Sequence, residues 1–150
     1  MTEMQAAIGR IQLKYMPDWT KKRRENAKKI DHICNRFDAL RVVNVPDCME
    51  HAEYKHYVFV KPSGLGKGWN RDRIVGEINA EGVPCFQGSC SEVYLEKAFD
   101  NSGFRPAVRL RNAKLLGETS LMFLVHPTLT AFEIDKTCEA IDNVMIRASL

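Results

Sequence analysis

The first third of the chain places apolar residues at helical spacing. Thr2 and Gln5 have the spacing of a capping box, which predicts a helix that begins at once. This helix is expected to end near residues 14–15, because Pro17 suits the first turn of a second helix. The second helix is expected to run to about Phe37. Its apolar face consists of Trp19, Ala27, Ile30, Cys34 and Phe37.

Four segments have the composition of short strands. Residues 41–46 (RVVNVP), 53–62 (EYKHYVFVKP) and 83–86 (VPCF) are rich in β-branched or aromatic residues, and proline closes the first two. Residues 120–127 (SLMFLVHP) are almost continuously apolar, as expected of a strand that is covered on both faces.

Further helices are predicted between and after these strands. Asn70 is expected to cap a helix that Gly82 ends, and Thr130 with Glu133 forms a capping box for the last helix. A short helix is expected within 91–99. Residues 107–118 predict another helix, with an inward face of Val108, Leu110, Ala113 and Leu116.

These elements predict an α+β fold in which a small, mainly antiparallel sheet is packed with helices mainly against one face. At 150 residues, with no repeat and no evident boundary, residues 1–150 are expected to form a single domain.

Charge, hydropathy and cysteine content argue against several classes of protein. The 22 basic and 19 acidic residues give a net charge of only +3, so no nucleic-acid partner is expected. The basic run KKRR at 21–24 is interpreted as a solvated helix face. No apolar run is long enough to span a membrane, and five cysteines without a CxxC pair argue against a disulfide framework. A cytoplasmic location is expected.

Three candidate chemistries are incomplete. The loop GLGKG at 64–68 lacks the first glycine and the final hydroxyl of a Walker A motif. Cys48, His51 and His56 supply only three of the four ligands of a structural zinc site. A thiolate–imidazole pair of Cys85 or Cys90 with His126 is conceivable, but no spacing brings these residues together. No catalytic residue and no metal site is therefore predicted.

One polar loop has no structural explanation in the sequence. Residues 85–94 (CFQGSCSEVY) follow a strand end and offer hydroxyl, amide and phenol groups around the permissive Gly88. The alternative is a packed surface excursion. If this region contacts a substrate, the expected residues are Phe86, Gln87, Ser89, Ser91 and Tyr94.

Several segments together resemble one enzyme family. They are MTEMQAAIGRIQL with the basic helix that follows it, YKHYVFV, RDRIVGEINAEGVPC and SLMFLVHPTLTAFEID. In this order they resemble the C-terminal part of the DegT/StrS family of pyridoxal-phosphate-dependent sugar aminotransferases, over nearly the whole chain. The resemblance implies the C-terminal small-domain fold of fold-type I pyridoxal-phosphate-dependent transferases.

The resemblance also implies that a partner domain is missing. In that family a larger N-terminal domain holds pyridoxal phosphate through a lysine in a Ser-Phe-x-x-x-Lys setting, and this sequence has no match to that motif. We therefore expect the chain to be the C-terminal domain of a larger aminotransferase, to bind no coenzyme alone and to be inactive alone. Apolar residues of the first helix, normally covered by the larger domain, are expected to be exposed.

For the whole enzyme, the resemblance implies transfer of an amino group from glutamate to a nucleotide-linked keto-sugar, in surface polysaccharide or lipopolysaccharide synthesis, by a homodimer. The loop at 87–94 departs from the His/Tyr/Pro-rich loop of the family, and Lys55 replaces a histidine of its strand motif. These departures leave the individual substrate contacts open. The competing interpretation is a free-standing, non-catalytic binding or adaptor module with the same fold.

Overall fold

The structure, a computed structural model, describes all residues 1–150. Its helices are α1 (Glu3–Cys34), α2 (Arg71–Ala80), α3 (Arg111–Thr119) and α4 (Ala131–Ala148). Its strands are β1 (Leu40–Val42), β2 (His56–Val60), β3 (Cys85–Phe86) and β4 (Ser120–Phe123). Short 3₁₀ turns lie at Pro62–Gly64, Val93–Leu95 and Lys97–Phe99.

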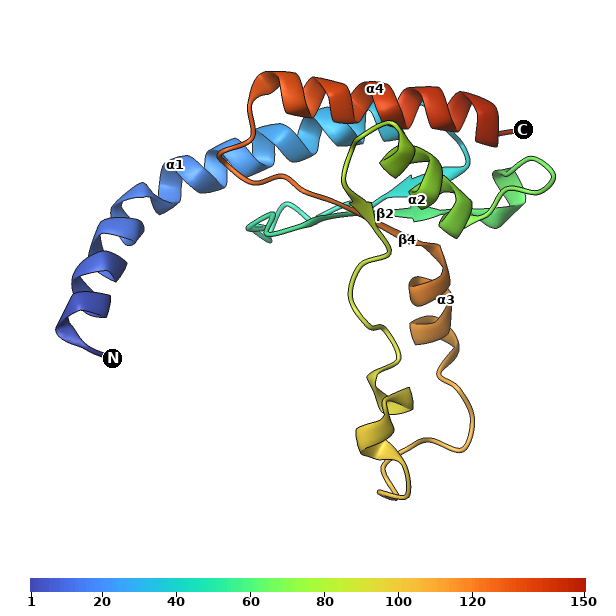
Figure 1. The fold of residues 1–150 in the computed structure, drawn as a ribbon, viewed down its shortest axis with the longest axis horizontal. Helices are drawn as coiled ribbons and strands as arrows, with labels where there is room; N and C mark the ends of the chain where they lie inside the picture. Colours follow the sequence, from blue (N-terminus) through green and yellow to red (C-terminus); the bar gives the residue numbers. More distant parts are fainter.

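The four strands form one antiparallel sheet in the order β1-β2-β4-β3. His56 lies opposite Phe123 and Val58 opposite Leu121, so alternate residues of these strands face the same side. Helices α1, α2 and α4 cover that side, as Figure 1 shows. The prediction of a small antiparallel sheet with helices mainly on one face is confirmed.

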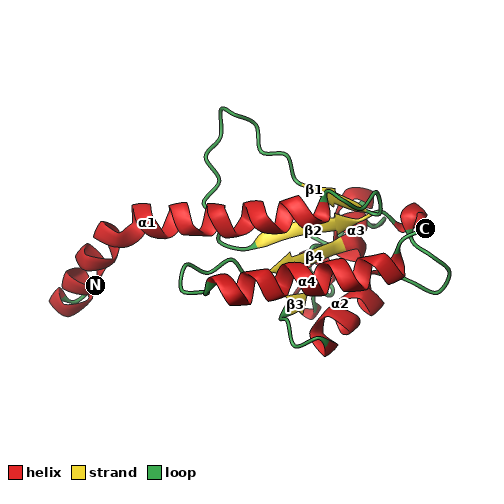
Figure 2. Ribbon diagram, turned by 90° about the horizontal axis from the view of Figure 1, so that it is seen from above, coloured by secondary structure: helices red, strands yellow, loops and turns green.

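Helices α1 and α4 run side by side over the sheet (Figure 2). The ion pair Lys29–Asp135 connects them, and Arg36, just beyond the end of α1, pairs with Asp142 at the same sequence separation, so the two helices run in the same direction. Exposed pairs of this kind contribute little, and the apolar contact dominates. The buried residues between these helices and the sheet include Ile30, Cys34, Ile141, Val144 and Met145.

The prediction of two helices before residue 37 is wrong, since α1 continues without interruption through Pro17. A proline inside a helix lacks the N–H that would bond four residues back, to the carbonyl of Leu13. Here Leu13 is exposed, so water can reach that carbonyl. Figure 1 shows the N-terminal half of α1 curving away from the body of the domain.

Residues 87–119 leave the sheet after β3 and return through α3, and we call this segment the arm; it projects from the side of the sheet opposite α4 (Figure 1). Two corrections concern it. The expected helix within 91–99 is replaced by two 3₁₀ turns. The helix predicted from residue 107 begins only at Arg111, and Val108, Leu110 and Leu116 are exposed rather than inward. No other element of the arm packs against these apolar side chains, so they stay exposed.

The helix ends follow the sequence closely. Thr130 and Glu133 form the predicted capping box, and the Asn70 side chain accepts a hydrogen bond from the N–H of Arg73. Gly82 ends α2 with a φ of 78°, a conformation that glycine adopts without steric cost. No helix combines the length and the apolar composition that crossing a lipid bilayer would require.

Candidate functional site

The predicted substrate loop begins where β3 ends and folds over the face of the sheet opposite α1 and α4. Gly88 has a φ of 95°, and a Cβ atom added there would lie 2.6 Å from Cε1 of Tyr57. The Tyr57 hydroxyl lies 3.1 Å from Oγ of Ser89. Tyr57 therefore positions the loop through both its ring and its hydroxyl, and only glycine fits against the ring.

Gln87 is fixed at both its side chain and its backbone. Its Nε2 donates to Oδ1 of Asp72 at 2.8 Å, and its carbonyl accepts from Oγ of Ser120 at 2.5 Å. Arg71 supports this arrangement, because its Nε donates to Asp72 at 2.7 Å and its Nη1 to the carbonyls of Gly117 and Ser120. The Arg71 side chain is only 11% exposed. A charge-assisted network built on the nearly buried Arg71 side chain thus holds the start of the loop.

A hollow of about 480 Å³ opens between this loop and α3. Gln87, Ser89 and Ser91 line it on the loop side, and Lys114 and Glu118 line it on the helix side. The hollow is polar and open, with few apolar side chains. Such a surface offers many hydrogen-bonding groups for a hydroxyl-rich ligand but little apolar area for a large hydrophobic one.

The other two predicted substrate residues lie elsewhere. Phe86 is the last residue of β3 and is partly exposed, outside the lining of the hollow. Tyr94 is bonded within the arm: its hydroxyl donates to Oε1 of Glu92 at 2.6 Å and accepts from the N–H of Leu110 at 2.9 Å. The structure thus brings three of the five predicted residues together at the hollow. Their contact with a substrate stays a prediction.

Charged groups hold the arm in place of an apolar core. Arg109 donates to both carboxylate oxygens of Glu92 through Nε and Nη2. These bonds, with that from Tyr94, lower the pKa of Glu92 to about 2, while burial and the bond to Glu92 raise the pKa of Tyr94. Arg105 donates to the carbonyls of Tyr94, Leu95 and Glu96.

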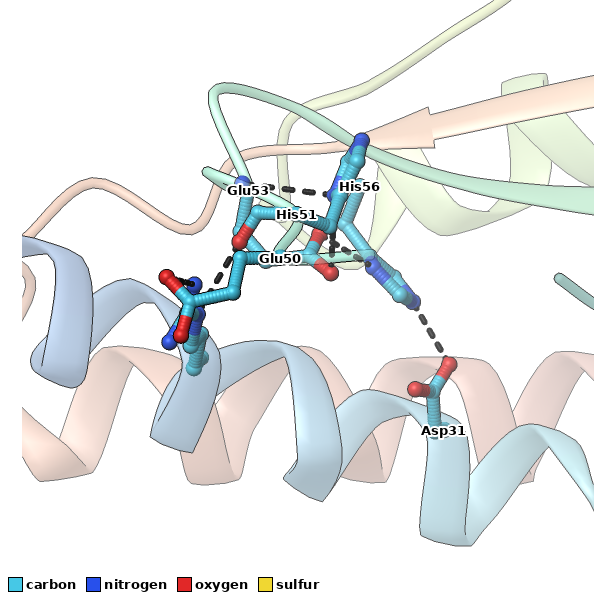
Figure 3. A network of polar contacts seen from close by, with 6 residues as sticks. Asp31, Glu50, His51, Glu53 and His56 are labelled. Atoms are coloured by element: carbon cyan, nitrogen blue, oxygen red, sulfur yellow. Dashed lines mark hydrogen bonds and ion pairs between the residues drawn. The ribbon is translucent and has the colours of Figure 1, made fainter. Parts of the chain in front are cut away.

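Figure 3 shows a second polar cluster, at the start of β2, which the sequence did not reveal. Nε2 of His56 lies 2.7 Å from Oδ1 of Asp31, and its Nδ1 lies 3.3 Å from Oε2 of Glu53. His56 is only 5% exposed. Burial lowers its pKa, but the bonds and charges of Asp31 and Glu53 outweigh burial, and the pKa is raised. The cluster binds the loop before β2 to helix α1.

Two of the three candidate zinc ligands, His51 and His56, are engaged by carboxylates in this cluster. His51 pairs with Glu53 at 3.0 Å, while His56 is held by Asp31 and Glu53, and Cys48 is exposed. No three side chains among histidine, cysteine, aspartate and glutamate are placed so that they could hold a metal ion.

The structure does not pair Cys85 or Cys90 with His126, as a thiolate–imidazole site would require. Cys85 is buried, and burial raises the pKa of its thiol to about 12. Cys90 donates to Glu96 at 3.4 Å, and Nδ1 of His126 lies 2.7 Å from Oγ1 of Thr128. None of the three forms a nucleophile–base pair.

A lysine that forms a Schiff base with pyridoxal phosphate must lose its proton, which burial favours. None of the eleven lysines is buried. The pKa of Lys29 is raised by its hydrogen bond to Asp135, which keeps the ammonium charged.

Comparison with known proteins decides the family. The profile of the DegT/DnrJ/EryC1/StrS aminotransferase family matches residues 1–142. The chain belongs to this family. A comparison with curated proteins gave no match.

Solved structures agree with the family assignment. An aminotransferase from Psychrobacter cryohalolentis is 58% identical with a TM-score of 0.93, and the match covers 97% of this chain and 39% of that one. TlmJ, an aminotransferase from Streptoalloteichus hindustanus, shares the fold at 21% identity and a TM-score of 0.80, with 94% and 36% covered. The PLP-form of the putative sugar aminotransferase Spr1654 from Streptococcus pneumoniae also shares the fold, at 19% identity and a TM-score of 0.80. That match covers 98% of this chain and 36% of the other. The family member described here thus spans about two-fifths of such chains.

Proposed function

We propose that this chain is the C-terminal domain of a pyridoxal-phosphate-dependent sugar aminotransferase. The observation that carries the proposal is the 58% identity to the Psychrobacter aminotransferase, over nearly all of this chain but only 39% of that one. The family match over residues 1–142 supports the same conclusion. The coenzyme-binding lysine then belongs to polypeptide outside these 150 residues, and the chain alone is inactive.

The hollow beside the loop is the proposed substrate wall. Gln87, Ser89 and Ser91 present amide and hydroxyl groups, and Lys114 is paired with Glu118 at 3.8 Å across the helix side. The amide and hydroxyl groups suit the hydroxyls of a sugar. In the whole enzyme they would orient a keto-sugar, while pyridoxal phosphate, when bound, supplies the electron sink for amino transfer.

The remaining parts of the proposal rest on the family. The amino donor is proposed to be glutamate, and the product to enter surface polysaccharide or lipopolysaccharide synthesis. The whole enzyme is proposed to be a cytoplasmic homodimer. The competing function is a free-standing, non-catalytic binding module with this fold.

The coding frame upstream of Met1 separates the two functions. An open frame that contains Ser-Phe-x-x-x-Lys, whose purified product shows the visible absorbance of lysine-bound pyridoxal phosphate, supports the aminotransferase. A start site at Met1 with no such frame would make the chain a free-standing module.

A further inference from the structure

Arg71 is the first residue of α2, and its guanidinium joins that helix to the end of α3. Its Nη1 donates to the carbonyls of Gly117 at 2.8 Å and Ser120 at 3.1 Å, and its Nε donates to Oδ1 of Asp72 at 2.7 Å. The carbonyl of Gly117 is one of the last four of α3, which lack partners inside a helix and carry partial negative charge. A nearly buried cation therefore stabilises the junction between α3 and β4.

The hollow of about 480 Å³ has a loop wall, residues 87–91, and a helix wall on α3, and both walls depend on this junction. Gly117 lies on the helix wall, and a Cβ atom added there would lie 2.1 Å from Oγ of Ser91 and 3.2 Å from its Cβ. On the loop wall, the carbonyl of Gln87 accepts from Oγ of Ser120 at 2.5 Å. Because Arg71 bonds to Gly117 and Ser120 through one nitrogen, it holds the two walls at a fixed separation.

The same guanidinium also determines which atom of the Gln87 side chain is left for a ligand. Oδ1 of Asp72 accepts from both Nε of Arg71 and Nε2 of Gln87. Since a carboxylate only accepts hydrogen bonds, the amide turns its nitrogen toward Asp72. Oε1 of Gln87 has no hydrogen-bond partner within the chain and remains as an acceptor on the wall of the hollow. An acceptor here suits a sugar hydroxyl, which can donate.

Arg71 acts through these neighbours, because its own side chain lies outside the lining of the hollow. We infer that Arg71 is a positioning residue for the sugar: it sets the separation of the two walls and the orientation of the Gln87 amide, and thereby selects a ligand that donates a hydroxyl to Oε1. This inference rests on the proposed function and adds to it the residue that shapes the substrate wall. Lysine replaces it only in part, since all its donors share one nitrogen, whereas the guanidinium donates from Nε and Nη1 in a rigid plane.

The kinetic test compares two substitutions on α2 in the product of the complete coding frame. Arg71→Met should raise the KM for a nucleotide-linked keto-sugar at least about tenfold, because the walls no longer hold one geometry. Arg71→Lys should recover part of this loss. The control is Arg73→Met, since Arg73 donates to the carbonyl of Gly68 and stacks on Trp69, outside the lining of the hollow. It should leave the KM within about twofold of the native value.

The glutamate half of the reaction separates positioning from general damage. Amino transfer from glutamate to the coenzyme is measured without sugar, from the loss of the visible absorbance of lysine-bound pyridoxal phosphate. Arg71→Met should leave this rate within about twofold of the native rate, because only the wall for the sugar has changed. An unchanged KM for the sugar, or an equal loss in both halves of the reaction, would overturn the inference.

Hydrogen exchange in the 150-residue chain tests the two walls without turnover. In Arg71→Met, the amides of residues 87–91 and 117–120 should exchange at least about threefold faster, and those of α4 at the native rate. Native rates in either wall, or an equal acceleration in α4, would overturn the inference.

Asp72→Ala gives a second test if Arg71→Met does not fold, since the Asp72 side chain is 66% exposed. The substrates are the keto-sugar and analogues that each lack one hydroxyl. The native enzyme should prefer the keto-sugar over one of these analogues in kcat/KM, and Asp72→Ala should reduce that preference about tenfold, because the amide of Gln87 is free to turn. An unchanged preference would overturn the inference.

Exchange does not depend on turnover, so the two proposals fail separately. If the complete product transfers no amino group, the proposed function fails, while faster exchange in both walls of Arg71→Met retains the hold of Arg71 on the hollow. Amino transfer with an unchanged KM in Arg71→Met would retain the proposed function and remove the inference.

Discussion

The imidazole of His56 joins strand β2 to helix α1, with its Nε2 2.7 Å from Oδ1 of Asp31. Glu53 approaches the other ring nitrogen, so two carboxylates face one buried ring. The pKa of His56 is raised despite its burial. Its protonated form therefore stabilises the folded state.

The first prediction concerns pH. Because the folded pKa of His56 is raised, its contribution is complete below the unfolded value, about 6.5, and is lost as the pH rises through the folded value. Asp31→Asn should lower the free energy of unfolding by about 1–3 kcal/mol near pH 6, and by less above the folded pKa. Urea unfolding across this range measures it. Asp38→Asn, at an exposed position, is the control, and an equal loss at every pH would contradict the prediction.

The second prediction compares one substitution at two positions of α1. Ile30 is fully buried between α1 and the sheet, whereas Ile8 is 54% exposed. Ile30→Ala should lower the free energy of unfolding by about 2–5 kcal/mol, because it removes core contacts and leaves a cavity. Ile8→Ala should change it by no more than about 0.5 kcal/mol. Equal losses would mean that the exposed half of α1 already has a partner in the isolated chain.

The third prediction tests the anchoring of the loop. Gly88 and Gly103 both have positive φ, at 95° and 75°, but only Gly88 lies against a side chain. Gly103→Ala should cost about 1 kcal/mol through backbone strain alone. Gly88→Ala should cost about 1–3 kcal/mol more, since its Cβ would overlap the Tyr57 ring. Thermal unfolding of both variants measures the difference.

The double variant Gly88→Ala with Tyr57→Ala separates steric overlap from other causes. Removing the ring should recover most of the excess cost, so the two substitutions should not be additive. Strict additivity would show that Tyr57 does not restrict residue 88.

The fourth prediction concerns the arm. Arg109→Met removes both hydrogen bonds to Glu92 and should speed protease cleavage between residues 93 and 108. Arg111→Met, at an exposed residue just beyond this ion pair, should leave cleavage unchanged. Mass spectrometry of the fragments locates the cuts. If both variants are cut at the native rate, the ion pair does not hold the arm.

The Arg109–Glu92 pair should also make the stability of the arm depend on pH in the acid range. The pKa of Glu92 is lowered to about 2, so its contribution is present above the unfolded value, near 4.5, and is lost as the pH falls toward 2. Hydrogen exchange in the arm should accelerate through this interval. Exchange that does not change with pH, after correction for its intrinsic pH dependence, would contradict the assignment.

Local signals in the sequence predicted the parts of the fold that depend on near neighbours. The capping box of Thr130 with Glu133, the cap at Asn70 and the left-handed Gly82 each involve residues within one turn of each other. The α+β class followed from the same periodicities. The prediction of a helix boundary at Pro17 is wrong because an exposed helix tolerates the lost hydrogen bond when water reaches the free carbonyl.

The site depended on contacts between distant residues. The bonds of Gln87 to Asp72, and of Asp31 to His56, join segments that are 15 and 25 positions apart and share no motif. The prediction that Val108 lies on a buried helix face is wrong. Helical spacing shows which residues share a face but not whether another element packs against that face. The phenol of Tyr94, which the sequence offers as a substrate-binding group, is instead bonded to Glu92 inside the arm.

Nitrogen transfer tests the central claim most directly. The 150-residue chain and the product of the complete coding frame are each given ¹⁵N-labelled glutamate, pyridoxal phosphate and a panel of nucleotide-linked keto-sugars. Mass spectrometry then follows the label into amino-sugar. We expect labelled amino-sugar from the complete product and none from the chain alone. Label transferred by the chain alone, or none transferred by the complete product, would contradict the account.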